Sequence, residues 1–183
     1  MTLEIVQTGD PVLRKVAREM SVDEIRSEST QRLIAQMRDT MRAAPGVGLA
    51  APQIGESLQL AVIEDRSEYI KNVSAEQLAA RQREAIPFHV IINPKLRIVG
   101  ESTVDFFEGC LSVEGFVAIV SRGASVLVDC LNERGEPVKL RGEGWYARIL
   151  QHEIDHLNGT LYIDRMLTRS FSTVENLERF GQD

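Results

Sequence analysis

Cysteine is scarce in this sequence, with Cys110 and Cys130 the two thiols among 183 residues. The N-terminal residues also lack the basic start and apolar stretch of a signal peptide. Without an export signal, a reducing compartment with free thiols is a better interpretation than a disulfide. Acidic residues near the start argue against an organelle transit peptide. We therefore expect a cytoplasmic (bacterial) location, or an organelle matrix if the chain is a mature form.

Long apolar runs are also absent, and no stretch approaches the length of a membrane span, so we expect no membrane contact. Basic residues are outnumbered, with 21 Lys and Arg against 27 Asp and Glu and a formal net charge of −6. No basic run is visible, which argues against a broad nucleic-acid surface. Repeats and low-complexity tracts are missing as well. We expect one domain over residues 1–183, large enough to fold without a structural metal.

Hydrophobic periodicity predicts an amphipathic helix early in the chain. Between Ser29 and Pro45, apolar residues recur at helical spacing, and Ser29 or Thr30 is suited to cap the start. Met37 and Met41 lie on the apolar face, so we expect them in the core. The stretch that follows, GVGLAAPQIG, has three glycines and no alternation, which is typical of a loop built for close backbone approach.

Short segments rich in β-branched and aromatic residues dominate the middle of the chain, and the pattern predicts strands. A polar insertion after residue 64 is expected at the surface, with a short helix over residues 74–83, and NERGEP is expected as a turn between two strands. Helical periodicity returns in GEGWYARILQHEIDHLNG. The fold class predicted is α+β, with antiparallel sheets packed around a central helix. The predicted strands are 58–64, 88–94, 102–107, 116–121 and 124–132.

That late helix carries the pattern H-E-x-x-H, formed by His152, Glu153 and His156. Two histidines at this spacing with a glutamate between them are typical of a metal site with a general base. Trp145, Ile149 and both histidines fall on one helix face, so we expect the imidazoles to point into the protein. Zn²⁺ or Fe²⁺ can be bound at this spacing when a third ligand comes from elsewhere in the fold.

The third ligand is not supplied by the motif itself. A longer form of the pattern has a histidine where this chain has Tyr162. A carboxylate from the polar C-terminal stretch is an alternative, but Gly159 and a strand-like segment intervene. Cys130 ends an alternating strand, where a small buried thiol usually packs as a hydrophobe. The remaining candidates are Glu175 or Glu178, His89, Cys130 and Cys110.

Cys110 stands out by its context. It follows Glu108 and Gly109 at the end of a predicted strand, where glycine lets the backbone pass close to another group. A thiolate with two imidazoles would leave a tetrahedral ion one open position, which is a catalytic ligand count. For Cys110 taken alone, however, a buried inert thiol is the simpler interpretation. The residues by themselves leave the third ligand open.

Three segments together resemble the peptide deformylases. The family's G-x-G-x-A-A-x-Q stretch is present as Gly46 to Gln53, E-G-C-L-S as Glu108 to Ser112, and H-E-x-D-H as His152 to His156. The similarity extends from GDPVLRKVA near the start to YIDRM near residue 166. The insertion and the tail resemble the subgroup that includes plant-organelle enzymes and their bacterial relatives.

The resemblance implies an α+β fold and hydrolysis of the N-formyl group from the N-terminal methionine of newly made proteins, with release of formate. It implies Cys110, His152 and His156 as ligands of one divalent metal ion per chain. Fe²⁺ is implied in the cell, and Zn²⁺, Ni²⁺ or Co²⁺ also suit such ligands. Glu153 is implied as the general base that takes a proton from water and then passes it to the departing amine.

Further residues take roles through the same resemblance. The side-chain amide of Gln53 and the backbone N–H of Leu111 are implied as donors to the oxyanion. The peptide is expected to pair with main chain near Val47, Gly48 and Gly109, with the methionine side chain in an apolar pocket. The implied partners are N-formylmethionyl nascent peptides and, through them, the ribosome.

One position departs from the family pattern. The family commonly has arginine where this chain has Val117, although the later Arg122 is kept. That arginine lies toward the downstream end of the peptide, so we expect Val117→Arg to change KM for longer formyl-peptides more than kcat.

Two other functions fit parts of the pattern. A zincin-type endopeptidase would use His152, His156 and Glu175, and its Cys110→Ser variant would keep the metal. A non-catalytic Cys/His metal-binding module would fill all four positions by adding Cys110 and Cys130 to the two histidines, leaving no place for water.

Overall fold

The computed structural model describes residues 2–181, where helices and strands follow one another along the chain. The helices are α1 Val22–Arg26, α2 Glu28–Ala43, α3 Ser67–Ile70, α4 Ala75–Arg81, α5 Gly144–Leu157 and α6 Val174–Phe180. The strands are β1 Gly48–Ala50, β2 Leu60–Asp65, β3 Ile86–Ile98, β4 Thr103–Cys110, β5 Val113–Gly123, β6 Ser125–Leu131, β7 Pro137–Glu143 and β8 Ser172–Thr173. Short 3-10 helices are η1 Pro11–Arg14, η2 Ala51–Ile54, η3 Tyr162–Asp164 and η4 Thr168–Ser170.

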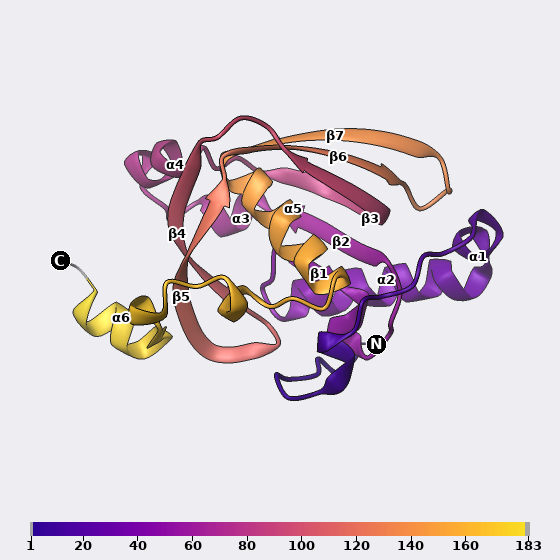
Figure 1. The fold of residues 1–183 in the computed structure, drawn as a ribbon, viewed down its shortest axis with the longest axis horizontal. Helices are drawn as coiled ribbons and strands as arrows, with labels where there is room; N and C mark the ends of the chain where they lie inside the picture. Colours follow the sequence, from indigo (N-terminus) through magenta and orange to yellow (C-terminus); the bar gives the residue numbers. More distant parts are fainter. Residues whose placement is uncertain (1, 182–183) are drawn as a thin grey trace.

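The strands form two sheets in which all neighbours are antiparallel. The larger sheet has the order β1-β2-β3-β6-β7, and the smaller has the order β4-β5-β8. Helix α5 packs against strands of both sheets and crosses the middle of the molecule (Figure 1). The predicted α+β class, with antiparallel sheets around a central helix that carries H-E-x-x-H, is confirmed.

Strands β1 and β2 of the larger sheet are buried on both faces because a helix covers each face there. Along β2, Leu60 and Val62 pack in the apolar cluster that contains α2, while Ala61 and Ile63 pack in the cluster that contains α5. Successive residues of a strand point to opposite faces, so a strand covered on both sides must be apolar throughout. This explains the unbroken apolar run at the start of β2.

Helix α5 is buried around nearly its whole circumference. From Ala147 to Leu157 every residue except the partly exposed His152 is buried, including the charged side chains. The helix ends at Leu157, and Gly159 follows with φ of +71°, a left-handed conformation that glycine adopts without steric cost. Polar side chains buried on such a helix must find partners, because an unpaired buried charge is strongly disfavoured.

Two local predictions are corrected by the structure. The N-cap of α2 is Ser27 rather than Ser29 or Thr30, and its Oγ accepts the backbone N–H of Thr30 at 3.3 Å. The glycine-rich stretch predicted as a loop contains the edge strand β1, in which Gly48 pairs with Ile63. A Cβ on Gly48 would collide with the side chain of Glu153. Glycine is therefore needed at this position of β1 despite its low strand propensity.

The predicted strands are found, and several are longer than their sequence signals. β5 runs from residue 113 to 123 rather than from 116 to 121, and β3 from 86 to 98 rather than from 88 to 94. The turn predicted at NERGEP joins β6 to β7, and Oδ1 of Asn132 accepts the backbone N–H groups of Arg134 and Glu136, each at 2.9 Å.

The insertion after residue 64 and the polar C-terminal tail both pack onto the rest of the fold. The predicted helix of the insertion is present as α4, capped by Ser74, and is preceded by the short α3. The polar tail forms η4, β8 and α6, and β8 pairs with β5. Within residues 2–181, no helix combines the length and apolar character needed to cross a membrane.

Candidate metal centre and active-site cavity

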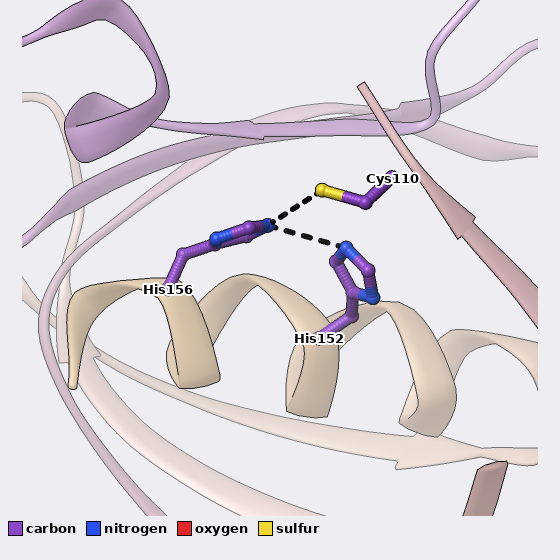
Figure 2. Close-up of side chains that lie close together, drawn as sticks. All are labelled: Cys110, His152 and His156. Atoms are coloured by element: carbon purple, nitrogen blue, oxygen red, sulfur yellow. Dashed lines mark hydrogen bonds between the residues drawn. The ribbon is translucent and has the colours of Figure 1, made fainter. Parts of the chain in front are cut away.

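Cys110, His152 and His156 converge where the end of β4 meets α5 (Figure 2). Sγ of Cys110 lies 3.3 Å from Nε2 of His156, which lies 3.3 Å from Nε2 of His152. The ligand atoms of the three residues lie within 4.8 Å of one another. A single ion with bonds of about 2.0–2.3 Å to sulfur and nitrogen can bridge atoms at these separations. The donor set therefore fits a divalent metal ion.

Glu108 fixes the orientation of His152. Nδ1 of His152 lies 3.0 Å from Oε2 of Glu108, so the imidazole donates at Nδ1 and leaves Nε2 free to face Cys110 and His156. Burial favours the neutral acid, but hydrogen bonds from Arg122 and His152 hold the pKa of Glu108 well below its usual range. A carboxylate that holds a histidine in this way is a common support for a metal ligand.

A buried ionic network surrounds Glu108. Arg122 donates from Nε and Nη2 to Glu108, at 2.9 Å each, and from Nη1 to Asp155 at 2.5 Å. Arg148 donates from Nη1 to Oε1 of Glu108 at 2.6 Å, and Arg165 reaches Asp155 from the surface at 2.7 and 2.8 Å. The network joins β4, β5 and α5, and it pairs Arg148 and Asp155, two charged side chains that α5 carries inward.

Glu153 is buried in the cavity without a charged partner. It is 3% exposed, and Oε2 has no hydrogen-bond partner in the described part of the chain. Burial raises the pKa of Glu153 to about 7. A Cβ on Gly48 would lie 2.1 Å from Oε1 of Glu153, so only glycine leaves room for this carboxylate. A buried carboxyl with such a pKa is suited to accept and release protons near neutral pH.

Gln53 is held with its amide NH₂ toward the thiol. Its Oε1 accepts the backbone N–H of Ala50 at 2.8 Å, which fixes which end of the amide points inward. Nε2 then lies 3.6 Å from Sγ of Cys110 and 3.4 Å from Oγ of Ser112. The backbone N–H of Ser112 also points at this sulfur, at 3.4 Å. Two N–H donors, from Gln53 and Ser112, therefore lie around the sulfur of this candidate metal ligand.

Cys110, His152 and Glu153 border one cavity of about 770 Å³, which Gln53 and Glu108 also line. It lies between two edge strands: β1 is the last strand of the larger sheet and β4 the last strand of the smaller. Each of these two strands pairs with a described strand on one side only. The backbone groups on the other side are available for pairing with a peptide. The residues predicted as oxyanion donors or peptide contacts also line this cavity: Val47, Gly48, Gln53, Gly109 and Leu111.

Part of the cavity wall is formed by residues that the sequence prediction did not assign. Trp145, Arg148 and Ile149 line it from α5. The guanidinium groups of Arg81 and Arg83, from the insertion, lie 5.0 and 5.1 Å from the ring centre of Trp145. The insertion was expected to be surface, and the structure corrects this in part, because it supports a wall of the cavity. The helical spacing that placed Trp145 on the same face of α5 as the two histidines was the sequence signal that could have identified it as a cavity residue.

The other candidate ligands lie elsewhere. Among residues 2–181 the group of donors close enough to share an ion is Cys110 with the two histidines. Cys130 packs in the apolar cluster between the larger sheet and α5, and His89 bonds the hydroxyl of Tyr146 at 2.9 Å. The buried ring of Tyr162 stacks on His152 with ring centres 6.3 Å apart. Neither Glu175 nor Glu178 on α6 joins the group.

Comparison with known proteins gives a consistent result. The profile of the family described as polypeptide deformylase matches residues 2–171. The chain is 51% identical over 175 residues to the chloroplastic peptide deformylase 1A of Solanum lycopersicum, covering 96% of this chain and 63% of the relative. It is 47% identical to peptide deformylase 3 of Streptomyces avermitilis, covering 94% of this chain and 75% of the relative. The chain thus spans less than two thirds of the tomato relative's length.

Solved structures agree in fold. The Met-Ala-Ser-bound class I type b peptide deformylase from Acinetobacter baumannii superposes with a TM-score of 0.80 at 30% identity. The match covers 91% of this chain and 99% of that structure. A profile match over nearly the whole sequence, close relatives and a shared fold lead to one conclusion. The chain belongs to the polypeptide deformylase family.

Proposed function

We propose that the protein is a metal-dependent peptide deformylase, which removes the N-formyl group from the N-terminal methionine of newly made proteins and releases formate. The observation that carries the proposal is the cluster of Cys110, His152 and His156, two of which line the same cavity as Glu153, whose Oε2 has no hydrogen-bond partner among the described residues. Three donors with a free base fit a hydrolytic site better than a closed structural one.

Cys110, His152 and His156 would hold the metal ion, and Glu108 would hold His152 in the required orientation. A divalent ion bound there supplies a Lewis acid that lowers the pKa of water and polarises a carbonyl. We propose Fe²⁺ as the ion in the cell, with Zn²⁺, Ni²⁺ and Co²⁺ as ions that the same donors accept. Thiolate and ferrous iron are both oxidisable, so the active protein should be sensitive to oxygen.

Glu153 would move the protons of the reaction. Its Oε atom takes a proton as water adds to the formyl carbon, and it returns that proton to the methionine nitrogen as the C–N bond breaks. The products are formate and a free amine, so atoms and charge balance. A carboxyl with a pKa near 7 can perform both transfers at neutral pH, and burial of Glu153 is the cause of that pKa.

Gln53 and Leu111 would stabilise the negative charge that develops on the formyl oxygen. The amide of Gln53 is already oriented by the bond from Ala50, so its NH₂ requires no rearrangement during the reaction. The backbone N–H of Leu111 follows directly after Cys110 at the edge of the same cavity. Donors fixed before the reaction contribute more than donors that must reorganise.

The peptide would lie between the two edge strands that border the cavity. Val47 and Gly48 would pair with it from the β1 side, and Gly109 from the β4 side. Its methionine side chain would enter the part of the cavity lined by Trp145 and Ile149. Recognition through backbone groups suits an enzyme whose substrates share only formyl-methionine. The Acinetobacter baumannii relative is described as bound to Met-Ala-Ser, which supports this class of ligand.

We further propose that residues 1–183 act as one catalytic domain on nascent chains, with the ribosome as the partner that presents them. Relatives described as chloroplastic or mitochondrial support an organelle matrix as one location, and the bacterial relatives support the bacterial cytoplasm as the other.

The test is formate release from formyl-Met-Ala-Ser. The protein would be purified without oxygen, reconstituted with Fe²⁺ or Ni²⁺, and compared with a chelated sample and with Glu153→Ala. Release that requires both metal and Glu153 is the expected result, with a loss of about 10²- to 10⁴-fold in the variant. Cleavage of an internal peptide bond would instead favour an endopeptidase, and bound metal without any release would favour a closed metal module.

A further inference from the structure

A two-residue turn, Leu111 and Ser112, joins β4 to β5 directly after the candidate metal ligand Cys110. Hairpin turns of this length usually have a positive φ at one or both central residues, because that geometry matches the twist of the strands. Neither Leu111 nor Ser112 has a positive φ. The turn that carries the proposed oxyanion donor of Leu111 therefore lacks the usual local conformation, and it depends on contacts from elsewhere.

Those contacts come from the start of the chain, which passes beside the turn (Figure 1). The backbone N–H of Thr8 donates to the carbonyl of Ser112 at 2.7 Å. Nε2 of Gln7 donates to the carbonyl of Leu111 at 2.9 Å. Oε1 of Gln7 accepts the backbone N–H of Glu114 at 3.3 Å. Three hydrogen bonds thus tie the turn and the start of β5 to residues 7 and 8.

The same segment also holds the other proposed oxyanion donor, Gln53. The backbone N–H of Val6 donates to the carbonyl of Gln53 at 2.9 Å. Residues 6–8, here called the N-terminal arm, therefore contact both segments that carry the donors. Consecutive Cα atoms lie 3.8 Å apart, so Val6 and Thr8 are separated by at most about 7 Å. An arm this short fixes how far the segment of Gln53 lies from the turn of Leu111.

We propose that Gln7 is a positioning residue, which aligns the backbone N–H of Leu111 with the amide of Gln53 so that both reach the formyl oxygen. This rests on the proposed deformylase function. Oxyanion donors act only when they point at the position that the developing charge will occupy. The side chain of Gln7 supplies two of the three bonds between arm and turn, and the third comes from backbone. Replacing this side chain should loosen the turn without detaching the arm from Gln53.

The surroundings of Gln7 suit a role in geometry better than a role in stability. Its side chain is exposed, and a hydrogen bond that competes with water adds little to the stability of a fold. Gln7 nevertheless lines the active-site cavity, as do Leu3 and Ile5, the alternate residues before it. An exposed side chain that uses both ends of its amide at the edge of this cavity can change the rate of the reaction while the fold stays intact.

The experiment compares Gln7→Met with Gln31→Met, because Gln31 makes equivalent bonds away from the cavity. Gln31 is also exposed, and its Nε2 donates to the carbonyls of Ile25 and Glu133 at 2.8 Å each. It does not line the cavity. Formate release from formyl-Met-Ala-Ser would be measured with metal-loaded protein. Hydrogen exchange of residues 108–116, metal content and thermal unfolding would be measured for the same proteins.

We expect Gln7→Met to lower kcat about 5- to 50-fold with little change in KM, a part of the 10²- to 10³-fold loss that follows removal of a whole oxyanion donor. Hydrogen exchange of the turn should become faster, while metal content and the unfolding temperature stay close to those of the parent. Gln31→Met should change neither kcat nor exchange of the turn. Should Gln7→Met fail to fold, Gln7→Glu replaces it, because it keeps the acceptor for Glu114 and loses the donor to Leu111.

A double-variant cycle with Gln53→Met separates alignment of two donors from a general loss of order. Without the amide of Gln53, the formyl oxygen can shift to meet a single donor. The loss caused by Gln7→Met should then shrink to about threefold or less, because alignment no longer matters and the two effects are not additive.

Three results would overturn the inference: a kcat for Gln7→Met within twofold of the parent, an equal loss in Gln31→Met, or the same loss from Gln7→Met with and without Gln53→Met. If the parent itself releases no formate, the proposed function fails separately. Hydrogen exchange then still decides whether Gln7 holds the turn, since unchanged exchange of residues 108–116 in Gln7→Met would show that it does not.

Discussion

At the scale of single residues, the position of Glu153 depends on the absence of a side chain at residue 48. The carboxylate fills the space that a Cβ on Gly48 would occupy. Glu153 is also adjacent in sequence to His152, so its backbone has little freedom to move aside without disturbing the metal ligands. Gly48 lies in a stretch that the sequence predicts as a loop. The structure shows that glycine is required at this position so that the carboxylate of Glu153, the proposed base, has room.

We predict that Gly48→Ala lowers kcat for formate release about 100-fold or more while the protein keeps its metal, because the displaced base loses its alignment. Metal content by mass spectrometry would be measured beside the rate. Gly46→Ala is the matched control, since its Cβ would meet the flexible end of Leu111 at 3.0 Å and should cost far less. A kcat for Gly48→Ala within twofold of the parent would contradict the proposed role of Glu153.

The two cysteines should differ in reactivity because their surroundings differ. Burial raises the pKa of Cys130 to about 11, so at pH 8 about one thiol in a thousand is ionised. We predict that iodoacetamide at pH 8 modifies Cys110 of the native metal-free protein and leaves Cys130 intact until the chain unfolds. As the pH rises toward 11, modification of Cys130 should increase about tenfold per unit. Site-resolved mass spectrometry would measure this, and equal labelling at pH 8 would refute it.

At the scale of elements, the insertion between β2 and β3 is fastened by one buried ion pair. Asp65 is fully buried, and Oδ2 and Oδ1 accept from Nε and Nη2 of Arg83 at 2.7 and 3.0 Å. The same arginine lies against Trp145, a wall of the cavity. Composition made this segment look like a surface excursion, and most of it is exposed. Its C-terminal end is nevertheless part of the support of the active site.

We predict that Arg83→Met lowers the free energy of unfolding by about 3–5 kcal/mol, because it leaves the buried carboxylate of Asp65 without a partner. Urea unfolding of the metal-free protein would measure it. Arg66→Met removes an exposed pair with Glu68 and should cost at most about 1 kcal/mol. The double variant Asp65→Leu with Arg83→Met should be more stable than Arg83→Met alone. A single variant as stable as the parent would show that the pair does not fasten the insertion.

At the scale of the whole molecule, the smaller sheet and α5 meet through buried charges rather than through apolar contact alone. Arg122 of β5 lies between Glu108 of β4 and Asp155 of α5, and all three are buried. Because Glu108 also holds His152, the same network supports the fold and orients a metal ligand. Stability and metal affinity should therefore change together when this network is altered.

We predict that Arg122→Met lowers the free energy of unfolding by about 3–5 kcal/mol and weakens metal binding by about 10- to 100-fold. Denaturant unfolding without metal and competition with a chelator would measure the two effects. Arg165→Met is the control, because among the described residues this half-exposed side chain pairs only with Asp155, so its replacement should cost at most about 1 kcal/mol. Loss of stability without loss of metal affinity would contradict the prediction that one network supports both the fold and the metal centre.

Local sequence patterns determined the elements and much of the site. Periodicity of 3.6 residues found α2 and α5, and clustered β-branched residues found β2 to β6, because both signals lie within a few neighbouring residues. The same local spacing put His152 and His156 on one face of a helix. Element ends were less accurate, as with the cap at Ser27, because a cap depends on a single turn rather than on a repeated pattern.

Only the tertiary structure decided which distant residues meet. Cys110 is 46 positions from His156, and the residues by themselves singled it out by its context but still left Cys130, His89 and two glutamates as alternatives. The pairing of Arg83 with Asp65, and of the tail with β5, had no local signal either. Such contacts depend on how whole layers pack, and no periodicity within one segment encodes the partner that packing will bring to it.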